Sequence, residues 1–72
     1  MMYTSTVIIQ KEGKWYVARS AEFGVVSQGR TIDQAKKNLQ EALELYLEDK
    51  PAQRKAIARE RPFVTSMDVQ YA

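Results

Sequence analysis

The serine of the stretch VSQG, Ser27, is the side chain that comes closest to a candidate nucleophile. A serine hydroxyl attacks a substrate when a neighbouring base removes its proton, and histidine is the base most often used. The chain contains no histidine, and no Gly-x-Ser-x-Gly elbow surrounds Ser27. We therefore expect Ser27 to belong to a hinge between two elements, and we expect the protein not to be an enzyme.

Carboxylates are the other groups that could transfer protons or hold a metal ion. Glu41, Glu44 and Glu48 follow at helical spacing, so they share one face of a helix. Lys37 lies close by, and a solvated stripe of charge is the ordinary explanation. A magnesium site needs acids that converge from separate elements, and nothing in the spacing of the aspartates indicates that they meet. The aspartates concerned are Asp33, Asp49 and Asp68.

Soft and borderline metals also lack their usual ligands in this sequence. Zinc and iron–sulfur sites need thiolate or imidazole groups, and the chain has neither cysteine nor histidine. The motif GKW at 13–15 is not a phosphate loop, because the glycine-rich lead and the following Ser or Thr are missing. The sequence therefore predicts no metal site and no cofactor.

The segment 50–61 is strongly basic, with five Lys and Arg residues and a single acid, Glu60. Clustered cations can neutralise phosphates and bind nucleic acid in a salt-sensitive way. No aromatic residue is interleaved for base stacking, so a solvated helix face or a contact for an acidic partner is the favoured interpretation, and nucleic-acid binding is the alternative. The residues of the nucleic-acid alternative are Lys50, Arg54, Lys55, Arg59 and Arg61.

The length of the chain limits its stability. Its 72 residues form one domain, and a domain of this size buries only about 60% of the surface that its unfolded chain exposes. No disulfide can compensate, because there is no cysteine, so we expect a homodimer or a higher oligomer. No leader-like start and no membrane-spanning apolar run is present, which favours a cytoplasmic protein without membrane contact.

Three strands are predicted before the helix. Alternating β-branched and aromatic residues indicate strands over 3–10 and 15–22, joined by a hairpin turn at 11–14. A short β-branched run at 25–28 is predicted to form the third strand.

One long amphipathic helix is predicted from Thr31 onward. The spacing T-x-x-Q of Thr31 and Gln34 is a capping box. The Thr31 hydroxyl can accept from a backbone N–H of the first helical turn, and the Gln34 side chain can accept from the backbone N–H of Thr31. Gly29 is expected to supply backbone freedom between strand and helix. Leu45 falls off the apolar stripe and is a candidate oligomer contact. The stripe itself is Ile32, Ala35, Leu39, Ala42, Leu43, Tyr46 and Leu47.

The remaining chain predicts a short helix over 51–60 and a fourth strand over 63–72, where apolar and polar residues alternate. The element order is then β-β-β-α-β, an α+β sandwich in which one long helix covers one face of a largely antiparallel sheet. The other face would carry Ile8, Tyr16 and Val64, a moderately apolar surface that another subunit or another protein could cover.

Residues 3–49 resemble the N-terminal domain of HicB-type antitoxins and their small stand-alone relatives. The segment SQG-x-T and the helix motif EA-x-x-x-YL carry the resemblance, and it extends over about two-thirds of the chain. The matching residues are Tyr3, Trp15-Tyr16-Val17-Ala18, Gly24, Val26-Ser27-Gln28-Gly29, Thr31, Ala35, Asn38, Glu41-Ala42 and Tyr46-Leu47. One departure is Phe23-Gly24-Val25, where the family usually has Pro-Gly-Cys.

The resemblance implies a non-catalytic, oligomeric module with a partial ribonuclease-H-like fold. HicB antitoxins bind HicA, a small basic RNA-cleaving toxin, and block its active site. Full antitoxins also carry a C-terminal DNA-binding domain, whereas this chain stops at Ala72, so we expect one HicB-like domain over 1–72 and no DNA binding. The candidate partner-binding residues are Tyr16, Gln28 and Leu45.

Overall fold

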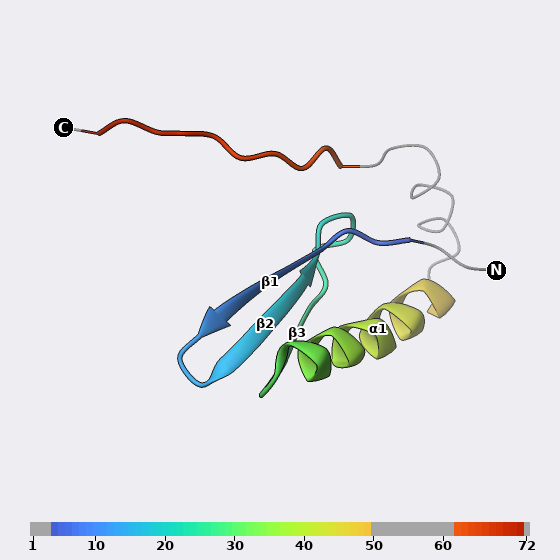
Figure 1. The fold of residues 1–72 in the computed structure, drawn as a ribbon. Helices are drawn as coiled ribbons and strands as arrows, with labels where there is room; N and C mark the ends of the chain where they lie inside the picture. Colours follow the sequence, from blue (N-terminus) through green and yellow to red (C-terminus); the bar gives the residue numbers. More distant parts are fainter. Residues whose placement is uncertain (1–3, 50–61, 72) are drawn as a thin grey trace.

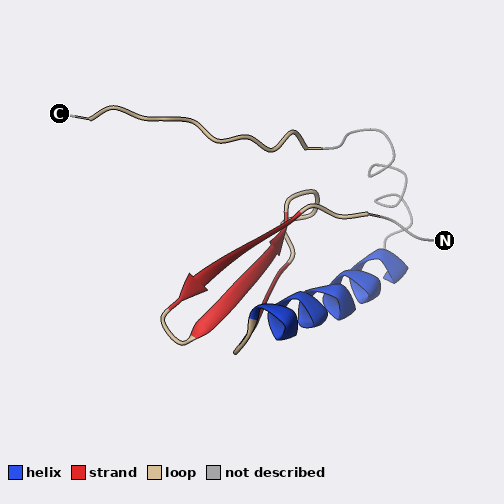
Figure 2. Cartoon of the chain, viewed as in Figure 1, coloured by secondary structure: helices blue, strands red, loops and turns tan. Residues whose placement is uncertain are grey.

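The described residues form three antiparallel strands followed by one helix that packs on one face of the sheet (Figure 1, Figure 2). This is a computed structural model, and it describes residues 4–49 and 62–71. The predicted α+β arrangement of a helix on an antiparallel sheet is confirmed. The elements are β1 (Val7–Glu12), β2 (Trp15–Ser20), β3 (Val26–Gly29) and α1 (Ile32–Asp49).

The β1–β2 hairpin is tighter than the predicted turn over 11–14. Glu12 pairs with Trp15, so the loop consists of Gly13 and Lys14 alone. Gly13 has a φ of 62°, a backbone conformation that a side chain would strain. A positive φ at the first loop residue but not at the second fits a type II′ turn, whose twist matches that of the two strands.

The register of the sheet separates the side chains into two faces. Ala18 is fully buried beneath α1 and pairs with Ile9, which also packs against the core. Tyr16 lies two residues from Ala18 and therefore shares this helix-covered face. The prediction that Tyr16 lies on the uncovered face is wrong, because the alternation in β2 runs in the opposite phase. The opposite face carries Ile8, as predicted, together with Val17.

The core beneath α1 is small. Its fully enclosed apolar residues within the described chain are Ala18, Ala35, Leu39 and Leu43. The Phe23 and Tyr46 rings extend it, with centroids 5.4 Å apart, and both side chains are only half-buried. The predicted helix stripe is correct apart from Ile32, which is 51% exposed at the start of α1. Leu45 is 65% exposed, which confirms that it lies off the stripe.

The predicted fourth strand does not form within residues 62–71. This segment is extended but pairs with no strand of the described chain, and it runs clear of the sheet in Figure 1. An alternating pattern gives a segment one apolar face, but a strand also needs an edge to pair with. The predicted helix over 51–60 falls outside the described residues. No helix in the described parts of the chain is long and apolar enough to cross a membrane.

Removing the Leu39 side chain should destabilise the fold strongly. Leu39 is 1% exposed, so Leu39→Ala leaves a cavity in the core and should lower the free energy of unfolding by about 3 kcal/mol. Leu45→Ala is the matched control on the same helix and should cost less than about 1 kcal/mol. Urea denaturation followed by helix ellipticity would measure both, and equal losses would contradict the described core.

Candidate functional site

The corner between β3 and α1 holds the SQG sequence and is closely packed. A Cβ atom placed on Gly29 would lie 2.5 Å from the backbone nitrogen of Ala35 and 2.9 Å from the carbonyl carbon of Gln34. The helix therefore approaches the strand so closely that only glycine fits. The expectation that Gly29 supplies unusual backbone freedom is wrong, since its φ is not positive and its missing side chain is what matters.

Hydrogen bonds fix the start of α1 at this corner. The backbone N–H of Gln34 donates to Thr31 Oγ1 at 3.0 Å, which confirms the predicted helix cap. The Gln34 side chain accepts from the backbone N–H of Arg30 at 2.7 Å, one residue earlier than a standard capping box requires. Asn38 Nδ2 donates to the carbonyl oxygen of Gln28 at 2.9 Å and ties the second turn of α1 to β3. These contacts make the corner a structural joint.

A hydroxyl–carboxylate network joins the segment before β1 to the connection between β2 and β3. Ser5 Oγ donates to Glu22 Oε1 at 2.8 Å and lies 2.9 Å from Ser20 Oγ. The backbone N–H of Thr6 donates to both carboxylate oxygens of Glu22, at 2.9 and 3.0 Å. Ser20 is fully buried, and Phe23 N–H donates to its hydroxyl at 3.4 Å. The network fastens the chain ahead of β1 to the sheet.

The electrostatics of Glu22 make it a poor proton acceptor. Partial burial acts to raise its pKa, but hydrogen bonds from the Ser5 hydroxyl and the Thr6 backbone act the other way, and the pKa lies below its ordinary value of 4.5. A carboxylate with a low pKa holds its charge and does not readily take a proton from serine. The Ser5, Ser20 and Glu22 cluster is therefore a structural network. Sequence reasoning missed it, because only the fold brings residues 5 and 22 together.

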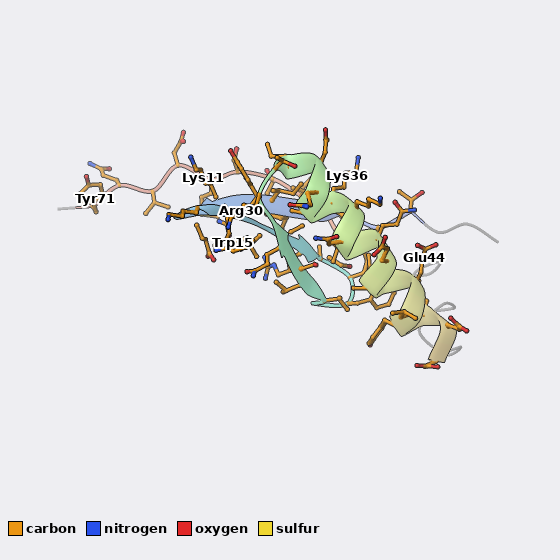
Figure 3. All side chains as sticks on the ribbon, turned by 90° about the horizontal axis from the view of Figure 1, so that it is seen from below. Lys11, Trp15, Arg30, Lys36, Glu44 and Tyr71 are labelled. Carbon is orange, nitrogen blue, oxygen red and sulfur yellow. The ribbon has the colours of Figure 1, made fainter. Side chains whose placement is uncertain are left out.

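Cations and aromatic rings meet at the hairpin end of the sheet. The guanidinium carbon of Arg30 lies 5.0 Å from the centroid of the Trp15 ring, and Lys11 Nζ lies 5.9 Å from that of Tyr16. Figure 3 shows Lys11, Trp15 and Arg30 grouped together, with Tyr71 lying farther out on the same side. Such exposed cation–π contacts contribute about 0.5–1 kcal/mol each. The Arg30–Trp15 contact helps to hold the β3–α1 connection beside the hairpin, whereas the Lys11–Tyr16 contact lies within the hairpin.

The outward side of α1 carries an exposed leucine among carboxylates, which we call the Leu45 face. Leu45 is 65% exposed. Residues three or four apart are neighbours on a helix, so Glu41 and Glu48 lie beside Leu45, and Glu44 is in turn a neighbour of both glutamates. The helix has no Lys or Arg after Lys37, so every charged residue in its second half is acidic. In Figure 3, Lys36 lies near the start of the helix and Glu44 lies farther along it.

The three predicted partner-binding residues do not form one surface. Tyr16 is half-buried on the helix-covered face of the sheet, where it packs against the core. Gln28 is exposed and pairs with Val17, so its side chain belongs to the opposite face. Leu45 lies on the outward side of α1. The five basic residues of the nucleic-acid alternative lie within 50–61, outside the described residues.

No group of three or more acidic residues that could hold a metal ion occurs within 4–49 and 62–71. In comparisons with known proteins, no family model, no curated protein and no solved structure matches the chain. The HicB resemblance therefore rests on the residues of the sequence alone.

Acid should weaken the Glu22 network. The folded-state pKa of Glu22 is depressed, so its stabilising contribution is present above its ordinary value of 4.5 and is lost as the pH falls through the lower folded value. Between neutral pH and about pH 3, the free energy of unfolding should fall by about 0.5–1 kcal/mol less in Glu22→Gln than in the wild type. The difference is small because the carboxylate is partly solvated. Denaturation series at several pH values would measure the difference, and parallel pH profiles would contradict it.

Adding one methyl group at Gly29 should loosen the joint. Gly29→Ala forces β3 and α1 apart and should cost about 1–3 kcal/mol of unfolding free energy. Ser27→Ala, two residues earlier on the same strand, is the control and should cost less than about 1 kcal/mol. Thermal unfolding of both variants would decide the matter, and an unaffected Gly29→Ala protein would show that the close approach is not required.

Proposed function

We propose that this chain is a non-catalytic, HicB-like interaction module that binds a small basic protein through the Leu45 face. The observation that supports the proposal is the exposed Leu45 side chain among acidic residues on the outward side of α1. An apolar anchor inside a charged rim is the usual anatomy of a protein-binding surface. Leu45 supplies the anchor, and Glu41 and Glu44 belong to the rim.

The charge of this face selects the chemistry of the partner. An acidic surface attracts a basic protein, speeds its association and repels acidic competitors. A small RNA-cleaving enzyme is basic because it must hold phosphates, so the acidic face of α1 would compete with RNA for the same cations. This is the antitoxin-type role that the resemblance to HicB implies, with a HicA-like ribonuclease as partner. A cytoplasmic location belongs to the same proposal, because the RNA that such a toxin cleaves is found there.

The test is co-expression with each small basic protein encoded beside the gene, followed by titration of the purified pair. Wild-type protein should form a complex and suppress any RNA cleavage by its partner. Reversing the charge with Glu41→Lys and Glu44→Lys should weaken binding about tenfold or more at low salt, and less at high salt where charges are screened. Leu45→Gln should weaken it at every salt concentration, because it removes the apolar anchor.

Two controls separate the Leu45 face from general effects of charge and surface. Glu12→Lys with Asp68→Lys makes the same change in net charge on the hairpin and near the C-terminus, and Ile32→Gln removes an exposed apolar side chain at the other end of α1. Both should leave binding nearly unchanged. Equal weakening by test and control variants would contradict the proposal. Salt-sensitive binding of RNA in place of protein would support the nucleic-acid alternative through 50–61.

A further inference from the structure

The C-terminal segment, residues 62–71, has the pattern of a strand and the exposure of a loop. Apolar side chains alternate with polar ones along it, apart from Val64 and Thr65. Phe63 and Tyr71 are each 90% exposed, and Met67 is 82% exposed. Large apolar side chains gathered on one face of an extended segment indicate an interaction surface, which another part of the protein or another molecule covers.

β1 offers an edge on which such a segment can pair. The strand order is β1-β2-β3, so within the described chain β1 pairs on one side only. A free edge presents backbone N–H and carbonyl groups to any extended segment of matching length. The ten residues of the C-terminal segment are enough to span the six residues of β1.

The helix-covered face also lacks apolar cover beside β1. The enclosed core lies between β2 and α1, whereas Val7 and Ile9 of β1 are only half-buried at its margin. A strand added beyond β1 would place its alternate side chains next to these two residues and beneath the open flank of α1. Phe63, Thr65, Met67, Val69 and Tyr71 form the alternate set that would turn inward. The intervening Ser66, Asp68 and Gln70 would remain in water.

We propose that the C-terminal segment of one copy pairs with the β1 edge of a second copy, and that the second copy returns the same contact. The segment runs clear of its own sheet (Figure 1) and its large apolar side chains are exposed, so they remain available to the sheet edge of another chain. A second copy presents an identical edge and an identical free segment. In a dimer with one two-fold axis, each C-terminal segment therefore pairs with the β1 edge of the other copy, and neither edge stays unpaired.

This assembly involves surfaces different from those of the proposed function. The exchange uses β1 and the C-terminal segment, whereas the proposed partner contact uses the outward side of α1. The dimer can therefore fail while partner binding succeeds, and the reverse is equally possible.

Cross-linking between two distinguishable chains tests the exchange directly. The natural chain has no cysteine, so one protein would carry Gln10→Cys in β1, and a second, extended by a short mass tag, would carry Asp68→Cys. After refolding together, a short bis-maleimide should join the two chains, because adjacent strands lie about 4.8 Å apart. Lys37→Cys on α1 in place of Gln10→Cys is the control and should give little cross-linked product.

Charge placed on the inward set should dissolve the dimer. Met67→Asp with Val69→Asp should raise the dimer dissociation constant about a hundredfold or more, because it buries two carboxylates. Ser66→Asp with Gln70→Asp adds the same charge on the outward set and should change it by no more than about threefold. Ellipticity should show α1 intact in both variants, since these side chains are exposed in the single chain.

Three outcomes would overturn the proposal. Wild-type protein that sediments as a monomer at every accessible concentration would do so. Cross-links that form only within a single chain carrying both Gln10→Cys and Asp68→Cys would show that the segment returns to its own sheet. If the inward double variant and the outward double variant weakened the dimer equally, the second copy would not be recognising the inward side chains of the segment.

Discussion

The close approach of α1 to β3 at Gly29 is the constraint on which the rest of the described structure depends. Because the first turn of the helix lies directly against the backbone of the strand, Ala35 and Leu39 reach Ala18 on the central strand and enclose it. The Thr31 cap and the Asn38 bond to the β3 backbone hold the helix in that position. The same placement directs Leu45 and its acidic neighbours away from the sheet.

A helix held this close to β3 cannot also cover the far edge of the sheet. The enclosed core is confined to β2 and α1, and the margin at β1 stays half-open. Phe23 packs against this core and forms a tilted ring contact with Tyr46. A small domain gains little stability from such a limited core, so further apolar cover at β1 is where it has most to gain. The proposed self-association and the proposed partner contact would then use separate surfaces of one small domain.

The sequence predicted those features that depend on local spacing. The apolar stripe of α1, the Thr31 cap and the exposed position of Leu45 all follow from a period of 3.6 residues. The prediction for Tyr16 is wrong because both faces of β2 carry apolar residues. The pattern within the strand therefore does not show which face the helix covers. The Ser5–Glu22 network joins residues distant in sequence, and no local pattern predicts such a pair.

The most direct test of the account is whether residues 62–71 pair with the β1 edge of a second copy. Amide hydrogen exchange should reveal protection of alternate N–H groups in this segment that rises with protein concentration, in step with the dimer fraction. Protection that is independent of concentration would mean that the segment pairs within its own chain. Exchange at the rate of an unstructured peptide at every concentration would contradict the account altogether.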